Sequence, residues 1–241
     1  MTPRLAQLRA CVAVLALVLL LPGIAASESA TLDSFERSAA AFADGLALAE
    51  RGLDDDAARS YEEAVRLDGG FVEAMVNLAR IRLHQGQPAR AREWLDRALR
   101  TAPAYPPAHA ARGLEARARG DLQEALRAFS RARALDPGNV EALANLGAIL
   151  FELSLYDDAR AVLEEARRRA PERPEPLLTL ALVWEQKGDA VRAAFFYGQF
   201  LRLVGSDDPE RPLAERRIQE LDRRSLKTVT PVAETESDNT Q

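Results

Sequence analysis

A period of 34 residues runs through most of the chain and constrains its fold more than any other feature. Repeats with this spacing indicate copies of one supersecondary unit, each burying its apolar face against the next. Positions 34 residues apart form a column when the repeats are aligned. Alanine fills every position of one column, and glycine fills four of the five positions of another. The alanines are Ala57, Ala91, Ala125, Ala159 and Ala193, and the second column is Gly52, Gly86, Gly120, Ser154 and Gly188.

Two further columns hold one large and one small residue in each unit. The large residues are Tyr61, Leu95, Phe129, Leu163 and Tyr197. The small ones are Gly45, Ala79, Gly113, Gly147 and Ala181. Small side chains allow two helix backbones to approach closely, and a large side chain fills the space beside them. The small column and the alanine column are therefore expected to face each other within a helical hairpin.

The spacing inside each unit predicts two α-helices joined by a tight turn. In residues 140–173, Leu143, Leu146 and Leu150 recur at helical spacing, and Ala159 and Leu163 repeat it after the turn. The glycine column is expected to end each first helix, because a left-handed backbone is least costly for glycine.

Other residues are expected to mark where the second helices start and where they stop. Asp121 and Asp189 follow the glycine column as N-cap candidates, and Glu124 completes a capping-box pattern with Asp121. Prolines that stop the second helix occur at Pro103, Pro137 and Pro171.

These motifs resemble the tetratricopeptide repeat, whose pattern is W-x₂-L-G-x₂-Y, then A-x₃-F, then P, at a period of 34 residues. Leu143-x₂-Leu146-Gly147-x₂-Leu150, Ala159-x₃-Leu163 and Pro171 match that pattern. The aromatic start is missing from every unit, and apolar residues usual in the family are replaced by Asp44, His109 and Arg112. The resemblance implies an all-α fold, an α-α solenoid forming a right-handed superhelix. Its five helix-turn-helix repeats would be residues 38–71, 72–105, 106–139, 140–173 and 174–207.

The segments flanking the repeats differ from them in pattern. Residues 208–224 predict a capping helix, because Ala214, Ile218 and Leu221 share one face that can cover the last repeat. Residues 27–37 predict a lead-in that extends the first helix back toward Thr31. Residues 225–241 are polar without apolar periodicity and predict a disordered tail.

Residues 1–26 have the layout of a secretory signal peptide. Arg4 and Arg9 precede an apolar run from 10 to 21, and small residues follow at 25–27. Cleavage is expected between Ala25 and Ala30, and retention as an N-terminal membrane anchor is the alternative. Cys11 lies inside this segment, so the cleaved chain would contain no cysteine.

Charge and composition exclude several classes of function. The formal net charge is −5, whereas nucleic-acid binders usually carry a basic excess. His84 and His109 lie in adjacent units on different helix faces, without the spacing of a metal site. The sequence has no nucleophile motif and no glycine-rich phosphate loop. We therefore expect no enzyme activity, no cofactor, no metal and no nucleic-acid partner.

The family resemblance implies a concave groove lined by the first helix of each unit. Asn77 and Asn145 share one groove column, where amides could bind the backbone of an extended peptide. Arg80 and Arg117 could bind acidic groups, and Leu114, Ala148 and Leu182 supply apolar surface. The predicted groove residues are Asn77, Arg80, His84, Leu114, Arg117, Glu141, Asn145, Glu152, Leu182 and Gln186.

The expected function is a non-enzymatic scaffold or assembly factor that binds a protein, either as a peptide or as a helix. Its expected location is the periplasm or cell envelope of a bacterium, given the signal peptide and the predominance of arginine over lysine. One alternative is an adaptor kept on the membrane by the uncleaved N-terminal segment. Another is an accessory to a cell-wall enzyme, for which Glu141, Glu152 and His84 would be the candidate residues.

Overall fold

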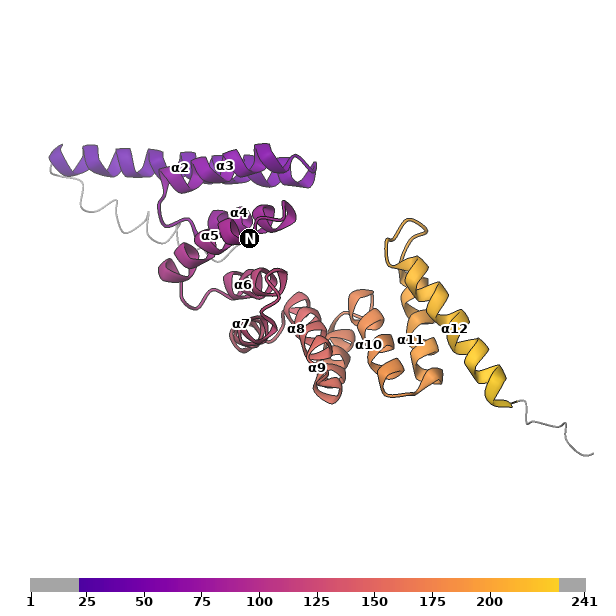
Figure 1. Cartoon of the computed structure of the whole chain (residues 1–241). Helices are drawn as coiled ribbons and strands as arrows, with labels where there is room; N and C mark the ends of the chain where they lie inside the picture. The colour runs from indigo at the N-terminus through magenta and orange to yellow at the C-terminus, as the bar shows by residue number, and fades with distance from the viewer. Residues whose placement is uncertain (1–21, 230–241) are drawn as a thin grey trace, which may run out of the picture. The chain divides into compact units, whose positions relative to one another are not determined.

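The computed structural model describes the backbone of residues 22–229 and the side chains of residues 32–223, and all of its regular elements there are α-helices (Figure 1). This confirms the predicted all-α class. The chain divides into two compact units after Pro103. The first unit holds α2 (Pro22–Glu50), α3 (Asp54–Leu67), α4 (Val72–His84) and α5 (Pro88–Thr101).

The second unit holds three helical hairpins and a final helix. Its hairpins are α6 (Pro106–Ala118) with α7 (Leu122–Leu135), α8 (Val140–Glu152) with α9 (Tyr156–Arg169), and α10 (Glu175–Gln186) with α11 (Ala190–Leu203). The last helix is α12 (Arg211–Val229). Helices adjacent in sequence pack against each other within every hairpin, and α8 also packs on α10. This is the packing of an α-solenoid.

The turns inside the hairpins confirm the role of the glycine column. Gly52, Gly86, Gly120 and Gly188 all have positive φ, between 68° and 78°. Ser154, which occupies the fifth position of that column, also has a positive φ of 62°. A side chain in this conformation meets its own carbonyl, so serine adopts it at a cost that glycine avoids.

Both predicted N-caps are present. The carboxylates of Asp121 and Asp189 accept hydrogen bonds from the backbone N–H groups of Glu124 and Arg192, each at 2.9 Å. The predicted capping box at α7 is only half formed: the Glu124 carboxylate pairs with arginines, while the Asp121 N–H donates to the Ala116 carbonyl. An arginine offers a carboxylate a charge-assisted bond, which is stronger than one from a neutral amide.

The core of each hairpin explains why the small column must be small. A Cβ added to Gly45 would lie 2.6 Å from the Tyr61 ring, and one added to Gly113 would lie 2.6 Å from the Phe129 ring. Gly147 is covered in the same way by Leu163. The alanine column is completely buried in all five units. The small column thus packs against the large column of its own hairpin.

Helix α2 is more than twice as long as the other first helices of the repeats, with 29 residues against 12 or 13. It begins at Pro22, further toward the N-terminus than the predicted lead-in at residue 27. Proline is favoured in the first turn of a helix, and the alanines between residues 25 and 30 are strong helix formers. Residues 1–21 of the predicted signal peptide lie outside the described part of the chain.

Helix α12 covers the end of the second unit. Ala214 is fully buried, Leu221 is 5% exposed, and Ile218 packs against the same core. The helix begins at Arg211 rather than 208, because Asp208 first accepts the N–H of Glu210 in a turn. It ends at Val229 rather than 224, so residues 225–229 of the predicted tail are helical. Residues 213–230 contain no glycine or proline that would stop the helix earlier. The remaining tail lies outside the described residues.

Candidate functional site

Three predicted groove residues lie on α4 in the first unit. The Asn77 side chain is half-buried and hydrogen-bonds the Tyr61 hydroxyl. Burial raises the pKa of Tyr61, and that hydrogen bond partly offsets the rise. Arg80 is half-buried, whereas the His84 side chain is 78% exposed with Nδ1 4.0 Å from Oδ2 of Asp54. Asn77 thus contacts the core tyrosine of the preceding hairpin.

The second unit carries the remaining predicted groove residues on its three first helices. Leu114 and Arg117 lie on α6, while Leu182 and Gln186 lie on α10. The side chains from α8 are Glu141, Asn145 and Glu152. Leu114 and Leu182 are half-buried and pack against the hydrophobic core, whereas Gln186 is exposed.

One ion pair joins groove residues from neighbouring repeats. Nη2 of Arg117 lies 2.6 Å from Oε1 of Glu152, and the two side chains are 45% and 30% exposed. Both residues were predicted for the groove from their column positions, and the structure brings them together. In the free chain, Arg117 is thus paired with a carboxylate of the chain itself, and its binding to an acidic partner stays a prediction.

Asn145 is also engaged within the chain. Its Nδ2 donates to the backbone carbonyl of Glu141 at 3.0 Å, one turn earlier on α8. An amide has two N–H donors and a carbonyl acceptor, so this bond leaves Asn145 with hydrogen-bonding capacity. The pairing of Asn77 and Asn145 as a ladder stays a prediction, because the two residues belong to different units.

Two charged residues at the start of α10 were missed by the sequence reasoning. Arg173 Nη2 lies 2.8 Å from Glu175 Oε1. Burial raises the pKa of Glu175, but the hydrogen bond from Arg173, a backbone hydrogen bond and the charge of Arg173 together outweigh it, so the net pKa is lowered. The charge of Glu141 also acts on Arg173. Glu175 could have been found, because it stands one period after Glu141 in the same column.

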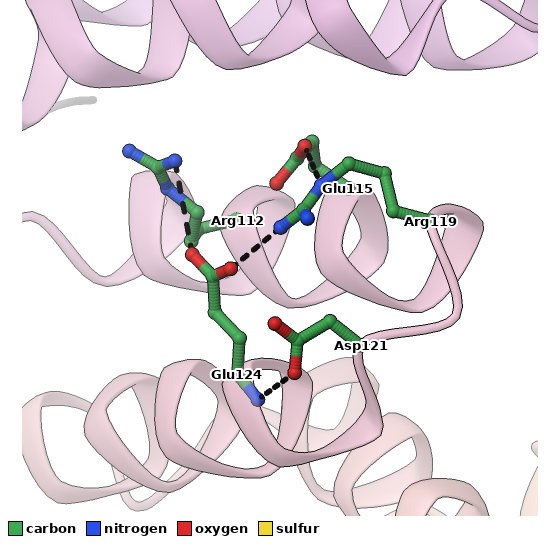
Figure 2. Close-up of polar contacts among 5 residues, drawn as sticks. All are labelled: Arg112, Glu115, Arg119, Asp121 and Glu124. Atoms are coloured by element: carbon green, nitrogen blue, oxygen red, sulfur yellow. Dashed lines mark hydrogen bonds and ion pairs between the residues drawn. The ribbon is translucent and has the colours of Figure 1, made fainter.

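A separate polar cluster occupies the third repeat (Figure 2). Glu115 is completely buried, and its Oε1 accepts a bond of 2.6 Å from Nε of Arg119. Arg119 also contacts Glu124 at 2.5 Å, and Arg112 lies 3.9 Å from the other oxygen of Glu124. The equivalent residues in repeats two, four and five are aliphatic: Leu78, Leu146 and Leu180 for Arg112, and Ile81, Ile149 and Val183 for Glu115. The charged substitutions in this repeat therefore compensate one another.

The second helices of the second unit form a cleft that the sequence did not predict. It lies between α7 and α9 and has a volume of about 470 Å³. Leu126, Leu146 and Val162 line it, and the ion pair of Arg133 with Glu165 at 2.9 Å crosses its edge. The leucine and valine residues of this cleft already belong to the core or pack against it.

Two features are absent from the part of the chain that the structure describes. Nowhere in that part of the chain do three or more histidine, aspartate or glutamate side chains gather to form a possible metal site. Within residues 22–229, no helix combines the length and apolar character that crossing a bilayer requires.

Several solved structures have similar folds. The structure from a functional characterization of Pseudomonas aeruginosa pilF has a TM-score of 0.68 and 18% identity, covering 82% of this chain and 94% of that one. TTC0263 of Thermus thermophilus, described as a thermophilic tetratricopeptide repeat protein, has a TM-score of 0.64 and 22% identity, covering 76% and 99%. YrrB, described as a tetratricopeptide repeat protein with an unusual peptide-binding site, has a TM-score of 0.57 and 16% identity, covering 74% and 90%.

The sequence has no significant match among curated proteins. The family model described as tetratricopeptide repeat matches residues 48–114 and 116–183, which is more than half of the chain. With the five helical hairpins, the left-handed turn residues and the paired small and large columns, this match shows that the chain belongs to the tetratricopeptide repeat family.

Proposed function

We propose that the protein is a non-enzymatic scaffold that binds a segment of another protein along the first helices of its second unit. The observation that carries this proposal is the Arg117–Glu152 ion pair at 2.6 Å. It joins side chains from α6 and α8 that were selected only by their position in the repeat. Groove columns of adjacent repeats therefore meet on one surface, as an extended binding site requires.

The composition of this surface indicates the chemistry of its partner. Leu114, Ala148 and Leu182 supply apolar area, and all three are half-buried rather than covered. Glu141, Glu152 and Glu175 supply three carboxylates, and two arginines, Arg117 and Arg173, form ion pairs with Glu152 and Glu175. A mixed peptide or amphipathic helix with apolar anchors and neutral or basic polar residues fits this surface better than an acidic one.

The peptide-binding relative supports this function by analogy. YrrB shares the fold and is described as having a peptide-binding site. Its 16% identity transfers the fold and not the partner. The partner must therefore be identified by experiment with this chain.

Site-specific photocrosslinking in cells tests the groove. A photoreactive phenylalanine analogue replaces Asn145 or Gln186 on the first helices, and Ser130 or Arg131 on α7 as matched controls. All four positions are half-buried or exposed. We expect a protein adduct from Asn145 and Gln186, identified by mass spectrometry, and none from the α7 positions. Adducts that form only from Ser130 or Arg131 would place the partner on the second helices and overturn the groove proposal.

We further propose that this scaffold acts outside the cytoplasm, in the periplasm or cell envelope of a bacterium. The support is the basic, apolar and small-residue order of residues 1–26. Mass spectrometry of the protein purified from its own cell tests this. A mature N-terminus between residues 26 and 31 is expected, and an intact terminus at Met1 or Thr2 would exclude cleavage.

A further inference from the structure

The outer face of α11 exposes apolar side chains that the core does not use. Val191 is 81% exposed and Phe195 is 57% exposed, one helical turn apart. Ala193, Phe196, Tyr197 and Phe200 on the opposite side of α11 are buried against the unit. Helix α11 is therefore apolar on both faces, although only one face has a partner among the described residues.

The other second helices show that this exposure is not a general property of the repeat. At the positions equivalent to Val191, Phe195 and Gly198, the first four repeats carry charged residues, other polar residues or alanine. These residues are Asp55, Arg59 and Glu62 on α3; Ala89, Glu93 and Asp96 on α5; Gln123, Arg127 and Ser130 on α7; and Asp157, Ala161 and Glu164 on α9. Only the fifth repeat replaces this solvated face with a valine, a phenylalanine and a glycine.

Gly198 adds a notch to the same face, one turn beyond Phe195. A Cβ built on Gly198 meets no atom within 4 Å. By contrast, the helical glycines Gly45, Gly113 and Gly147 are each filled by the large residue of their own hairpin. Gly198 is also in a helix interior, where glycine is less favourable than alanine by about 1 kcal/mol. Its notch is therefore open to an atom from outside the chain.

We propose that this face binds the same face of a second copy of the chain, with the two α11 helices antiparallel about a two-fold axis. The axis passes midway between residues 195 and 198. Phe195 of each copy then enters the notch above Gly198 of the other, so that one geometry satisfies both copies, as an isologous contact requires.

The same symmetry pairs the ends of the face. Residue 191 lies as far before the axis as residue 202 lies after it. The aliphatic stem of Arg202 therefore covers Val191 of the second copy, while its guanidinium extends toward the acidic N-cap Asp189. Arg202 is exposed on α11, and Asp189, which accepts the N–H of Arg192 and lies 3.4 Å from that residue's Nε, would be shared between the two arginines. Shape and charge of the face both select a second copy.

The contact is small, so the association is weak. One helix face buries less than the roughly 1,200–2,000 Å² of a stable interface, and the expected dimer is in rapid exchange with monomer. The proposed groove lies on the first helices, so dimerisation through α11 leaves that surface free for its own partner.

Sedimentation velocity of the full chain over a wide concentration range tests the proposal. The wild type should show a sedimentation coefficient that rises with concentration. Phe195→Arg introduces the residue found at the same position of α3 and α7, and Gly198→Glu fills the notch with the residue of α3 and α9. Each should raise the dimer dissociation constant by at least about tenfold. Leu155→Arg, at a residue 42% exposed elsewhere in the same unit, should leave it unchanged.

A measurement of stability separates loss of association from loss of folding. Thermal unfolding should show Gly198→Glu at least as stable as the wild type, because glutamate is the better helix former. The proposal is overturned if the wild type remains monomeric, or if the Phe195→Arg variant self-associates as strongly as the wild type.

Disulfide trapping tests the antiparallel register. In a Cys11→Ser chain, Val191→Cys and Arg202→Cys are prepared separately and then mixed. The mixture should form disulfide dimers much faster than either variant alone, since like positions lie about 16 Å apart along antiparallel helices. Efficient linkage within each single variant would indicate parallel helices and exclude the two-fold arrangement.

Discussion

Nε of Arg119 donates to Oε1 of Glu115 at 2.6 Å, although Glu115 has no exposed surface and stands in a column that is otherwise aliphatic. A buried carboxylate is tolerated when its charge is compensated, because desolvation otherwise disfavours the ionised form. Arg119 provides that compensation from the end of the same helix. The third repeat therefore keeps the fold of the family with paired charged side chains at positions where its neighbours have aliphatic ones.

Glu115→Gln should destabilise the chain. Removing the charge of Glu115 weakens a charge-assisted bond to a buried group, at a cost of about 1–2 kcal/mol in the free energy of unfolding. Urea denaturation measures this change. The double variant Arg112→Leu with Glu115→Ile restores the residue types of the other repeats, and Arg119 keeps its contact with Glu124. We expect the double variant to equal or exceed the wild type in stability, and a larger loss than for Glu115→Gln would contradict this interpretation.

Ser154→Gly should stabilise the turn between α8 and α9. Ser154 has a φ of 62°, a conformation that costs a residue with a Cβ about 1 kcal/mol relative to glycine. The reverse exchange Gly120→Ser provides the matched control, since Gly120 occupies the same column with a φ of 78°. Thermal unfolding should move in opposite directions for the two variants. A loss of stability for Ser154→Gly would refute the strain at this turn.

The same substitution at two helical glycines should have opposite effects. Gly113→Ala forces the Phe129 ring to move, because the new Cβ would lie 2.6 Å from it, and overpacking of this kind costs about 1–3 kcal/mol. Gly198→Ala enters open space and should stabilise α11 by up to about 1 kcal/mol. Chemical denaturation of both variants beside the wild type checks the signs. Equal effects would mean that helix propensity alone determines the outcome.

Tyr197 should make stability depend on pH in the alkaline range. Burial raises the pKa of Tyr197, as does the hydrogen bond of 2.9 Å that its hydroxyl donates to Glu185. The folded chain therefore holds this proton more tightly than the unfolded chain. The resulting stability is fully present below the ordinary tyrosine pKa of about 10 and is lost as pH rises above it.

Tyr197→Phe isolates that contribution. At pH 8 the variant should be less stable by about 1 kcal/mol, the value of one buried hydrogen bond. The difference should shrink between about pH 10 and pH 11, because unfolded Tyr197 ionises in the wild type and phenylalanine cannot. Urea unfolding at a series of pH values measures the gap. Tyr61 is present in both proteins, so its own raised pKa cancels from the comparison. A gap that stays constant with pH would rule out the titration of Tyr197.

Backbone features were predictable from the sequence because they recur. The repeat columns correctly placed the left-handed Gly120 and the N-cap Asp121, since both depend on local backbone geometry. Side-chain pairing was less accessible. The spacing placed Arg117 and Glu152 on a common surface but did not show that they bind each other. Glu124 fits a capping box in sequence, yet Arg112 of α6 and Arg119, the residue that caps the C-terminus of α6, compete for it in three dimensions.

The length of α2 was missed for a different reason. Periodicity defines a helix only where an apolar face repeats, whereas residues 22–31 extend the helix through alanine propensity without such a face. The exposed face of α11 was visible in the sequence as a departure from its four equivalents. The capping helix was instead expected to cover the last repeat, and it leaves Val191 and Phe195 exposed.

The extra length of α2 has a mechanical consequence. The part of this helix before Ser38 spans about 24 Å at the standard rise per residue, and Leu32, Asp33, Glu36 and Arg37 on it are exposed (Figure 1). A continuous helix resists bending far better than a loop. In the uncleaved chain this segment is therefore a stiff stalk that projects from the first hairpin, and cleavage between residues 25 and 30 would shorten it by four to nine residues.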